Sequence, residues 1–322
     1  MNNYFSHLSV APIPLWIGFS LGVIILLIVD LSLFKKFSKN NHNIKFALLE
    51  SAIWIGLALA FNAWFAYSYG HELGIQFLTG YLVEKSLSVD NLFIILLIFS
   101  SFKIPNPHQH RALFYGVLGA IVLRAFFIAA GAQLLHAFHW VLYIFGLILV
   151  LTAIKFLFES DNKNEVNENW SIKLIKKIYP TTNQLHGEKF FVTENNIKKA
   201  TPLFLSLIVI EVTDLVFAVD SIPAVFSVTQ DAFVAFASNI LAILGLRALY
   251  FVLADWVSKL RYLKPGLAAI LGFIGIKMLI IDIYKVPSEY SLLVIFSILT
   301  TAGLSSWYVA KQEERYAHKK LS

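Results

Sequence analysis

The chain has 322 residues, of which 58% are hydrophobic and 14% charged. Because the apolar residues run through its whole length, the composition indicates a polytopic membrane protein and excludes an ordinary water-soluble domain. The chain has no cysteine, which excludes disulfides, thiolate metal sites and thiol redox catalysis.

Nine apolar segments have the length needed to cross a bilayer as a helix, which is roughly 20 residues. They predict an all-α polytopic membrane protein with a single membrane domain, residues 1–322. No Lys or Arg precedes the first span, so we expect it to be retained rather than cleaved as a signal peptide. In chain order the spans cover residues 13–34, 46–69, 74–101, 110–133, 137–158, 201–226, 231–254, 264–283 and 289–310.

The positive charges between these spans predict the orientation of the chain. Of the 26 Lys and Arg residues, 20 fall in one set of alternate loops and the C-terminal tail, whereas the opposite loops contain only Lys285. Cytoplasmic loops carry such an excess, so we expect the N-terminus outside and the C-terminus in the cytoplasm, with the protein in the cell inner membrane. The net charge of +6 therefore reflects loops facing a lipid bilayer, and we expect no nucleic-acid partner.

One connection, residues 159–200, is much longer than the others and mixes seven lysines with six acids. Its segment WSIKLIKKIYP, residues 170–180, has apolar residues at near-helical spacing with lysines between them. That spacing predicts a short helix on the membrane surface. We interpret the connection as a cytoplasmic linker between two halves, and a binding site for a partner is the alternative.

Two spans carry acids inside their apolar runs. The segment EKSLSVDN covers residues 84–91, and EVTDLVFAVDSIP covers residues 211–223. A charge at bilayer depth costs at least about 2.5 kcal/mol on insertion scales, so such groups are rare and usually line a polar path. The two segments therefore favour a transporter.

The acidic segments belong to a longer repeated pattern. Each half contains two acids six residues apart, then a Leu-Arg-Ala segment, then an Ile-Lys pair. Three spans is an odd number, so the two units must insert with opposite orientation, which predicts a 3+3 inverted repeat over residues 74–158 and 201–283. The matching elements are Glu84 with Asp90, LRAFF at 123–127 and IKFL at 154–157, against Asp214 with Asp220, LRALY at 246–250 and IKML at 276–279.

Pro223 suggests how these acids reach one site. On a continuous helix of roughly 3.6 residues per turn, residues six apart point about 120° away from each other. Pro223 cannot donate a hydrogen bond to the carbonyl of Val219, so we predict a break near Asp220 that turns the carboxylates inward. The predicted site contains Glu84, Asp90, Glu211, Asp214 and Asp220, with Asn91, Ser221 and Asn239 as neutral oxygen ligands.

The chemistry of this set favours a hard divalent cation, because oxygen ligands select Mg²⁺, Ca²⁺ or Mn²⁺. Softer metals are disfavoured, since there is no Cys and all nine His residues fall in loops or near span ends. Carboxylates packed together also titrate as a coupled group. Metal binding could therefore release protons and couple transport to proton entry.

A purely structural alternative uses the same acids. Arg124 and Arg247 lie deep in their spans and need partners, for which the acids are suitable, so both are candidate supporting residues. Asp30 and Glu50 lie near the ends of their spans and are interpreted as helix-end charges. In this alternative the five acids are neutralised within the membrane by Lys85, Arg124, Lys155, Arg247 and Lys277.

The two acidic segments, together with SNILAILGLR at residues 238–247, resemble the TerC family and, within it, the Alx-type proteins. The resemblance runs from about Trp54 to Asp282. It implies a bacterial inner-membrane protein linked to tellurium resistance, the response to alkaline pH and manganese export, related to the LysE-like exporters. It implies metal binding by Asp90, Glu211, Asp214 and Asp220, and it extends to Glu84.

We therefore expect a secondary transporter that exports a hard divalent cation, with Mn²⁺ the first choice, in exchange for protons. We expect no enzymatic activity and no tightly bound cofactor, and the chain has no P-loop for direct use of ATP. One alternative is a non-transporting protein that modulates stress or redox responses through partners, although the absence of Cys weighs against intrinsic redox chemistry. The other is an oxyanion (tellurite) exporter that uses Arg124 and Arg247. The oligomeric state stays open.

Overall fold

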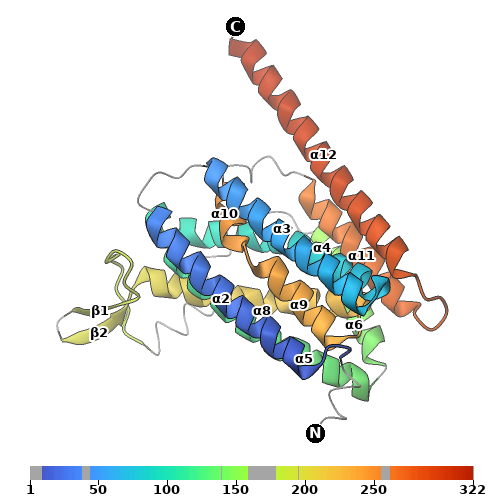
Figure 1. Cartoon of the computed structure of the whole chain (residues 1–322). Helices are drawn as coiled ribbons and strands as arrows, with labels where there is room; N and C mark the ends of the chain where they lie inside the picture. The colour runs from blue at the N-terminus through green and yellow to red at the C-terminus, as the bar shows by residue number, and fades with distance from the viewer. Residues whose placement is uncertain are drawn as a thin grey trace.

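Long helices make up most of the structure, a computed structural model that describes residues 9–37, 44–138, 140–158, 179–194, 196–254 and 262–321 (Figure 1). The last helix extends beyond the others toward the C-terminus (Figure 1). In chain order the helices are α2 (Ile13–Phe37), α3 (Ile44–Tyr69), α4 (His71–Ser101), α5 (Asn106–Ala137), α6 (Val141–Phe158), α8 (Pro202–Val228), α9 (Ala232–Ile243), α10 (Leu246–Ala254), α11 (Leu263–Leu279) and α12 (Ser288–Leu321).

Each of the nine segments expected to span the membrane contains a helix, and the helical polytopic architecture is confirmed. Within the described residues, seven helical stretches are long and apolar enough to cross a membrane. The acid-bearing α4 and α11, which has 17 residues, are not among them. Nine spans and the orientation of the termini therefore stay predictions.

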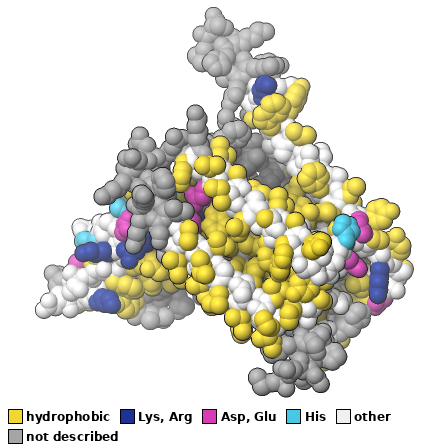
Figure 2. Space-filling view, in the orientation of Figure 1, with side chains coloured by type: hydrophobic (Ala, Val, Ile, Leu, Met, Phe, Trp, Pro, Cys, Tyr) yellow, Lys and Arg dark blue, Asp and Glu magenta, His cyan; other side chains and the backbone are white. Residues whose placement is uncertain are grey.

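The surface agrees with a bilayer environment. The outer faces of α2, α3 and α12 expose large apolar side chains such as Ile25, Ile53 and Leu293. Figure 2 shows hydrophobic side chains over the middle of one face, with Lys and Arg at its margins. A protein that exposes this much apolar surface is stable in lipid and would aggregate in water.

A two-stranded hairpin departs from the all-α expectation. Strands β1 (Phe191–Glu194) and β2 (Ile197–Ala200) pair antiparallel within the part of the 159–200 connection that the structure describes. Asn196, at the turn, has φ 60°, a left-handed conformation that Asn tolerates. The hairpin packs on the start of α8, where the rings of Phe191 and Phe204 lie 4.5 Å apart. The predicted surface helix at 170–180 falls mostly outside the described residues.

The predicted helix break is wrong in its position. Helix α8 continues through Pro223, and nearly every residue after Asp220 in this helix is buried, so packing holds the chain helical despite the missing hydrogen bond. The interruption lies instead between α9 and α10, at Gly245, whose φ of +81° is left-handed. A Cβ on Gly245 would come within 2.6 Å of the Trp54 ring of α3, so packing also requires glycine there.

The helices of the two predicted units pack against each other in a reciprocal way. Helix α4 packs on α8 and α9, while α8, its counterpart, packs on α4 and α5. The third helices, α6 and α11, cross where Gly146 and Gly275 bring their backbones into contact. This is the packing expected of the repeat units 74–158 and 201–283, which remain a prediction.

Candidate functional site

A buried arginine joins the two acidic segments. Arg124 of α5 is 1% exposed, and its guanidinium forms ion pairs with Glu84 of α4 and Asp214 of α8. The Asp214 pair is bidentate, with Nη2 at 2.9 Å from Oδ1 and Nε at 3.4 Å from Oδ2. Glu84 is fully buried, so this contact replaces water for both charged groups.

Two neutral side chains complete what we call the Arg124 cluster: Glu84, Arg124, Asp214, Ser221 and Asn239. Asn239 of α9 donates from Nδ2 to Glu84 Oε2 at 2.8 Å, and its Oδ1 lies 3.5 Å from Arg124 Nη1. Ser221 Oγ accepts from the same nitrogen at 3.4 Å. The cluster thus brings together side chains from four helices, α4, α5, α8 and α9.

Helical spacing explains which side chains meet. Asp214 and Ser221 lie seven residues apart on α8, so both face α5. Ser88 lies four residues after Glu84 on α4, and its hydroxyl approaches Glu84 Oε1 at 3.5 Å. Sequence reasoning did not select Ser88, although its i+4 position relative to Glu84 was a usable signal.

Glu211 lies beside the cluster and adds a third carboxyl group to this region. It precedes Asp214 by one turn of α8, and its carboxylate rests on Gly119 of α5, where a Cβ would overlap it. Among the described residues, no hydrogen bond or ion pair involves the Glu211 side chain.

The structure places Asp220 apart from this cluster. Its Oδ1 accepts a hydrogen bond of 2.8 Å from Thr152 Oγ1 of α6, and Lys155 on the same helix is its charged neighbour. Because α8 is continuous, the offset of about 120° between residues six apart is kept, and Asp214 and Asp220 face different helices. The prediction that all five acids meet in one site is therefore wrong for Asp220.

Two other candidates lie farther along α4. The backbone of Asp90 belongs to this helix, and its side chain lies outside the described part of the structure. Asn91 is buried, but it makes no hydrogen bond to the Arg124 cluster among the described residues.

Arg247, expected to support the acidic site, belongs to a second cluster. This α10 residue, 5% exposed, donates from Nη2 to Asp30 Oδ1 of α2 at 2.6 Å and approaches Glu50 Oε1 of α3 at 3.5 Å. The interruption at Gly245 places the start of α10 beside α2 and α3, which the repeat pattern did not reveal. Asp30 and Glu50 are therefore paired acids rather than solvated helix ends.

The remaining cations bear on the alternative in which five cations neutralise the five acids. Lys85 donates to the carbonyl of Ala242, near the end of α9, at 3.0 Å, where it meets one of the carbonyls that a helix end leaves unpaired. Lys277 donates to Ser291 Oγ at 2.9 Å. Together with Arg247, which pairs with Asp30 and Glu50, three of the five proposed cations have contacts outside the Arg124 cluster.

The cluster is not arranged as a metal centre in this state. Within the described residues, no three Asp, Glu or His side chains are grouped closely enough to hold a metal ion. The guanidinium of Arg124 lies among the oxygens instead.

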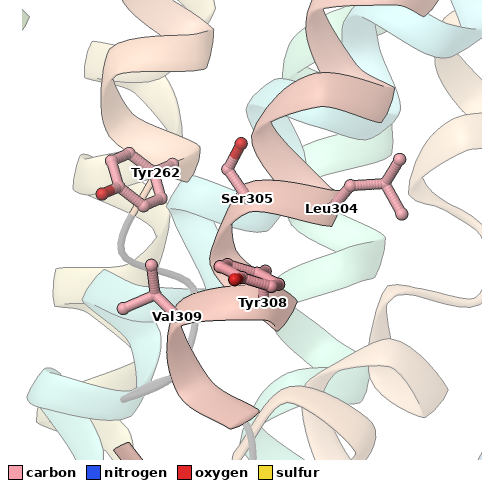
Figure 3. A pocket seen from close by; sticks show the side chains of 5 residues that line it. All are labelled: Tyr262, Leu304, Ser305, Tyr308 and Val309. Carbon is pink, nitrogen blue, oxygen red and sulfur yellow. The ribbon is translucent and has the colours of Figure 1, made fainter. Parts of the chain in front are cut away.

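A separate cavity of about 530 Å³ lies elsewhere, between Tyr262 and one face of α12 (Figure 3). The lining residues are Tyr262, Leu304, Ser305, Tyr308 and Val309.

Known proteins resemble this chain over most of its length. Residues 69–314 match the family described as integral membrane protein TerC family. An uncharacterized membrane protein of Myxococcus xanthus, STKORF319, is 46% identical over 300 residues, which cover 92% of this chain and 93% of that protein. The proteins named "putative membrane-bound redox modulator Alx" from Salmonella typhi and Escherichia coli K12 are each 44% identical, over 94% and 91% of this chain and 96% and 94% of theirs. No solved structure matches the chain.

Proposed function

Because this chain belongs to the TerC family of integral membrane proteins, we propose that it is an inner-membrane secondary transporter that exports a hard divalent cation. Mn²⁺ is the first choice of ion, and proton entry is the proposed driving force. We propose neither an enzymatic activity nor a tightly bound cofactor.

The observation that carries the proposal is the excess of carboxyl groups around one arginine, of which Glu84 is fully buried and Glu211 and Asp214 are half-buried. When ionised, Glu84, Glu211 and Asp214 carry three negative charges against the single positive charge of Arg124. The difference equals the charge of one divalent cation. A charge imbalance of this kind inside a membrane protein is costly unless the site takes up cations.

The available ligand atoms support the choice of ion. Glu84, Asp214, Ser221 and Asn239 offer carboxylate, hydroxyl and amide oxygens within one cluster. Oxygen sets of this type prefer Mg²⁺, Ca²⁺ and Mn²⁺ over softer metals. Asp90 and Asp220 would then act elsewhere on the same path.

The alternatives have less support. An oxyanion exporter would need free arginines, whereas Arg124 and Arg247 are each paired with two carboxylates. Redox modulation appears in the names of two relatives, but this chain has no cysteine, so such an effect would have to act through ion balance or through a partner.

The test is Mn²⁺ transport by the purified protein in proteoliposomes with an imposed pH gradient. We expect Glu84→Gln and Asp214→Asn to lower the transport rate to about a tenth or less, because each removes a charged ligand worth a few kcal/mol. Glu72→Gln is the matched control, since Glu72 is an exposed acid in the first turn of the same helix as Glu84. Wild-type protein that moves no divalent cation under any gradient would refute the proposal.

A further inference from the structure

We propose that Arg124 is a tethered counter-cation: it occupies the place of the transported ion while the site is empty and moves to Glu211 when the ion binds. This inference rests on the proposed function and specifies how the same site is emptied and refilled. It also gives Glu211 a role as the second partner of an arginine, distinct from that of an ion ligand.

The first step is the identity of the atoms around the guanidinium. Arg124 approaches Glu84, both carboxylate oxygens of Asp214, Ser221 Oγ and Asn239 Oδ1. These oxygens come from three helices, α4, α8 and α9, and they are the ones that a hard cation would use. The guanidinium therefore already occupies the space between the ligands.

The second step is competition. A divalent ion among these oxygens would lie within a few ångströms of a permanent positive charge, in surroundings that exclude water. Arg124 cannot lose its charge, because a guanidinium stays protonated in proteins. Binding thus requires the side chain to leave, and release requires it, or another cation, to return.

The third step is the destination. Gly119 lies five residues before Arg124 on α5, about 140° around the helix, so the Arg124 side chain has to swing around α5 to reach that position. Since Gly119 has no side chain, the carboxylate of Glu211 rests directly on the helix there. Glu211 lies one turn from Asp214 and has no ionic partner among the described residues. We assign Glu211 as the acid that receives the guanidinium.

The fourth step is charge balance. With the ion held by Glu84 and Asp214 and with Arg124 paired to Glu211, three negative charges meet three positive charges, counted without Lys85, which bonds the carbonyl of Ala242. In the empty state Glu211 is left without a counter-charge, which favours the arrival of a cation. A purely structural ion pair explains Arg124 but gives no reason for an unpaired acid beside it.

The experiment measures Mn²⁺ affinity of the purified protein by the loss of the free Mn²⁺ signal in electron paramagnetic resonance. We expect Arg124→Gln to bind Mn²⁺ about tenfold more tightly, because the competitor is gone, and yet to transport it more slowly, because release loses its driving group. Arg247→Gln is the matched control: it removes a buried arginine with two acidic partners, and we expect no gain in affinity. If Arg124→Gln binds Mn²⁺ as wild type does or more weakly, the inference is overturned.

Glu211 is tested by a double-mutant cycle. In the wild-type background Glu211→Gln should weaken Mn²⁺ binding several-fold, because Arg124 then has nowhere to go. In the Arg124→Gln background the same change should have almost no effect. An equal loss in both backgrounds would make Glu211 an ordinary ligand and overturn the proposed movement.

A third measurement does not depend on the folding of the glutamine variant. In Arg124→Ala, millimolar guanidinium ion should refill the cavity and compete with Mn²⁺, whereas it should not affect wild type. Failure of guanidinium to compete would count against the counter-cation role. If wild-type protein itself binds no Mn²⁺, the proposed function fails, and this outcome differs from failure of the inference alone.

Discussion

Glu211 rests on Gly119: the carboxylate from α8 occupies the space on α5 where any other residue would carry its Cβ. Glu211 lies one turn before Asp214 on the same helix, and Asp214 is already paired with Arg124 of α5. A single glycine thus decides how closely the acidic helix approaches the arginine helix.

Gly119→Ala should therefore lower both stability and Mn²⁺ affinity. In an unobstructed helix, Gly→Ala stabilises by about 0.4–1 kcal/mol, but here the added methyl group must displace a carboxylate. We expect a lower unfolding temperature, measured by thermal denaturation in detergent. Gly22→Ala on α2 is the matched control, because nothing lies within 4 Å of its added Cβ. A Gly119→Ala protein as stable as the control would contradict the observed contact.

The hydrogen bond from Thr152 to Asp220 predicts a separate effect. Thr152→Val keeps the shape of the side chain and removes the donor, so we expect stability to fall by about 1 kcal/mol. We also expect the transport rate to change, because we place Asp220 on the ion path. Thr300→Val removes an exposed hydroxyl that bonds only its own helix, and should change neither. Chemical denaturation and proteoliposome flux provide the two readings.

The Arg247 cluster should stabilise the fold without setting ion affinity. Breaking a buried ion pair costs about 3–5 kcal/mol when one partner stays behind, and Arg247 is 5% exposed beside Asp30. We expect Asp30→Asn to lower the unfolding free energy measurably while Mn²⁺ affinity stays within about twofold of wild type. A large loss of affinity would instead join this cluster to the ion site.

The hairpin should respond to pH through Glu194. Its pKa is lowered chiefly by the hydrogen bond from Lys199, with further bonds from His186 and Thr182. A depressed pKa in the folded state means that the carboxylate stabilises the hairpin above its ordinary pKa of 4.5, and that this contribution is lost as the pH falls through the lower folded value. Hydrogen exchange of β1 and β2, corrected for intrinsic rates, should show protection that is constant near neutrality and declines in acid. Glu194→Gln should remove that decline.

Much of this architecture follows from the sequence because the signals are local. Apolar runs of sufficient length locate the helices, and a charged residue inside such a run, such as Glu84, Arg124 or Asp214, must find a buried partner. Their meeting could therefore be predicted from residue type alone.

The remaining features depend on contacts between distant segments. Whether Pro223 or Gly245 interrupts a span is decided by packing, since the residues after Asp220 are buried in an intact helix while Trp54 fits against Gly245. The partners of Arg247 come from α2 and α3, outside the repeated units, and no spacing rule connects them. The hairpin consists of two strands of four residues, too short to stand out within a charged linker.

The central claim is that Glu84 and Asp214 bind a divalent cation, and a structure determined with Mn²⁺, using anomalous scattering at the manganese edge, tests it most directly. We predict a peak between these two carboxylates, with the Arg124 side chain turned toward Glu211. No peak at saturating Mn²⁺, with Arg124 still paired to both acids, would contradict the account.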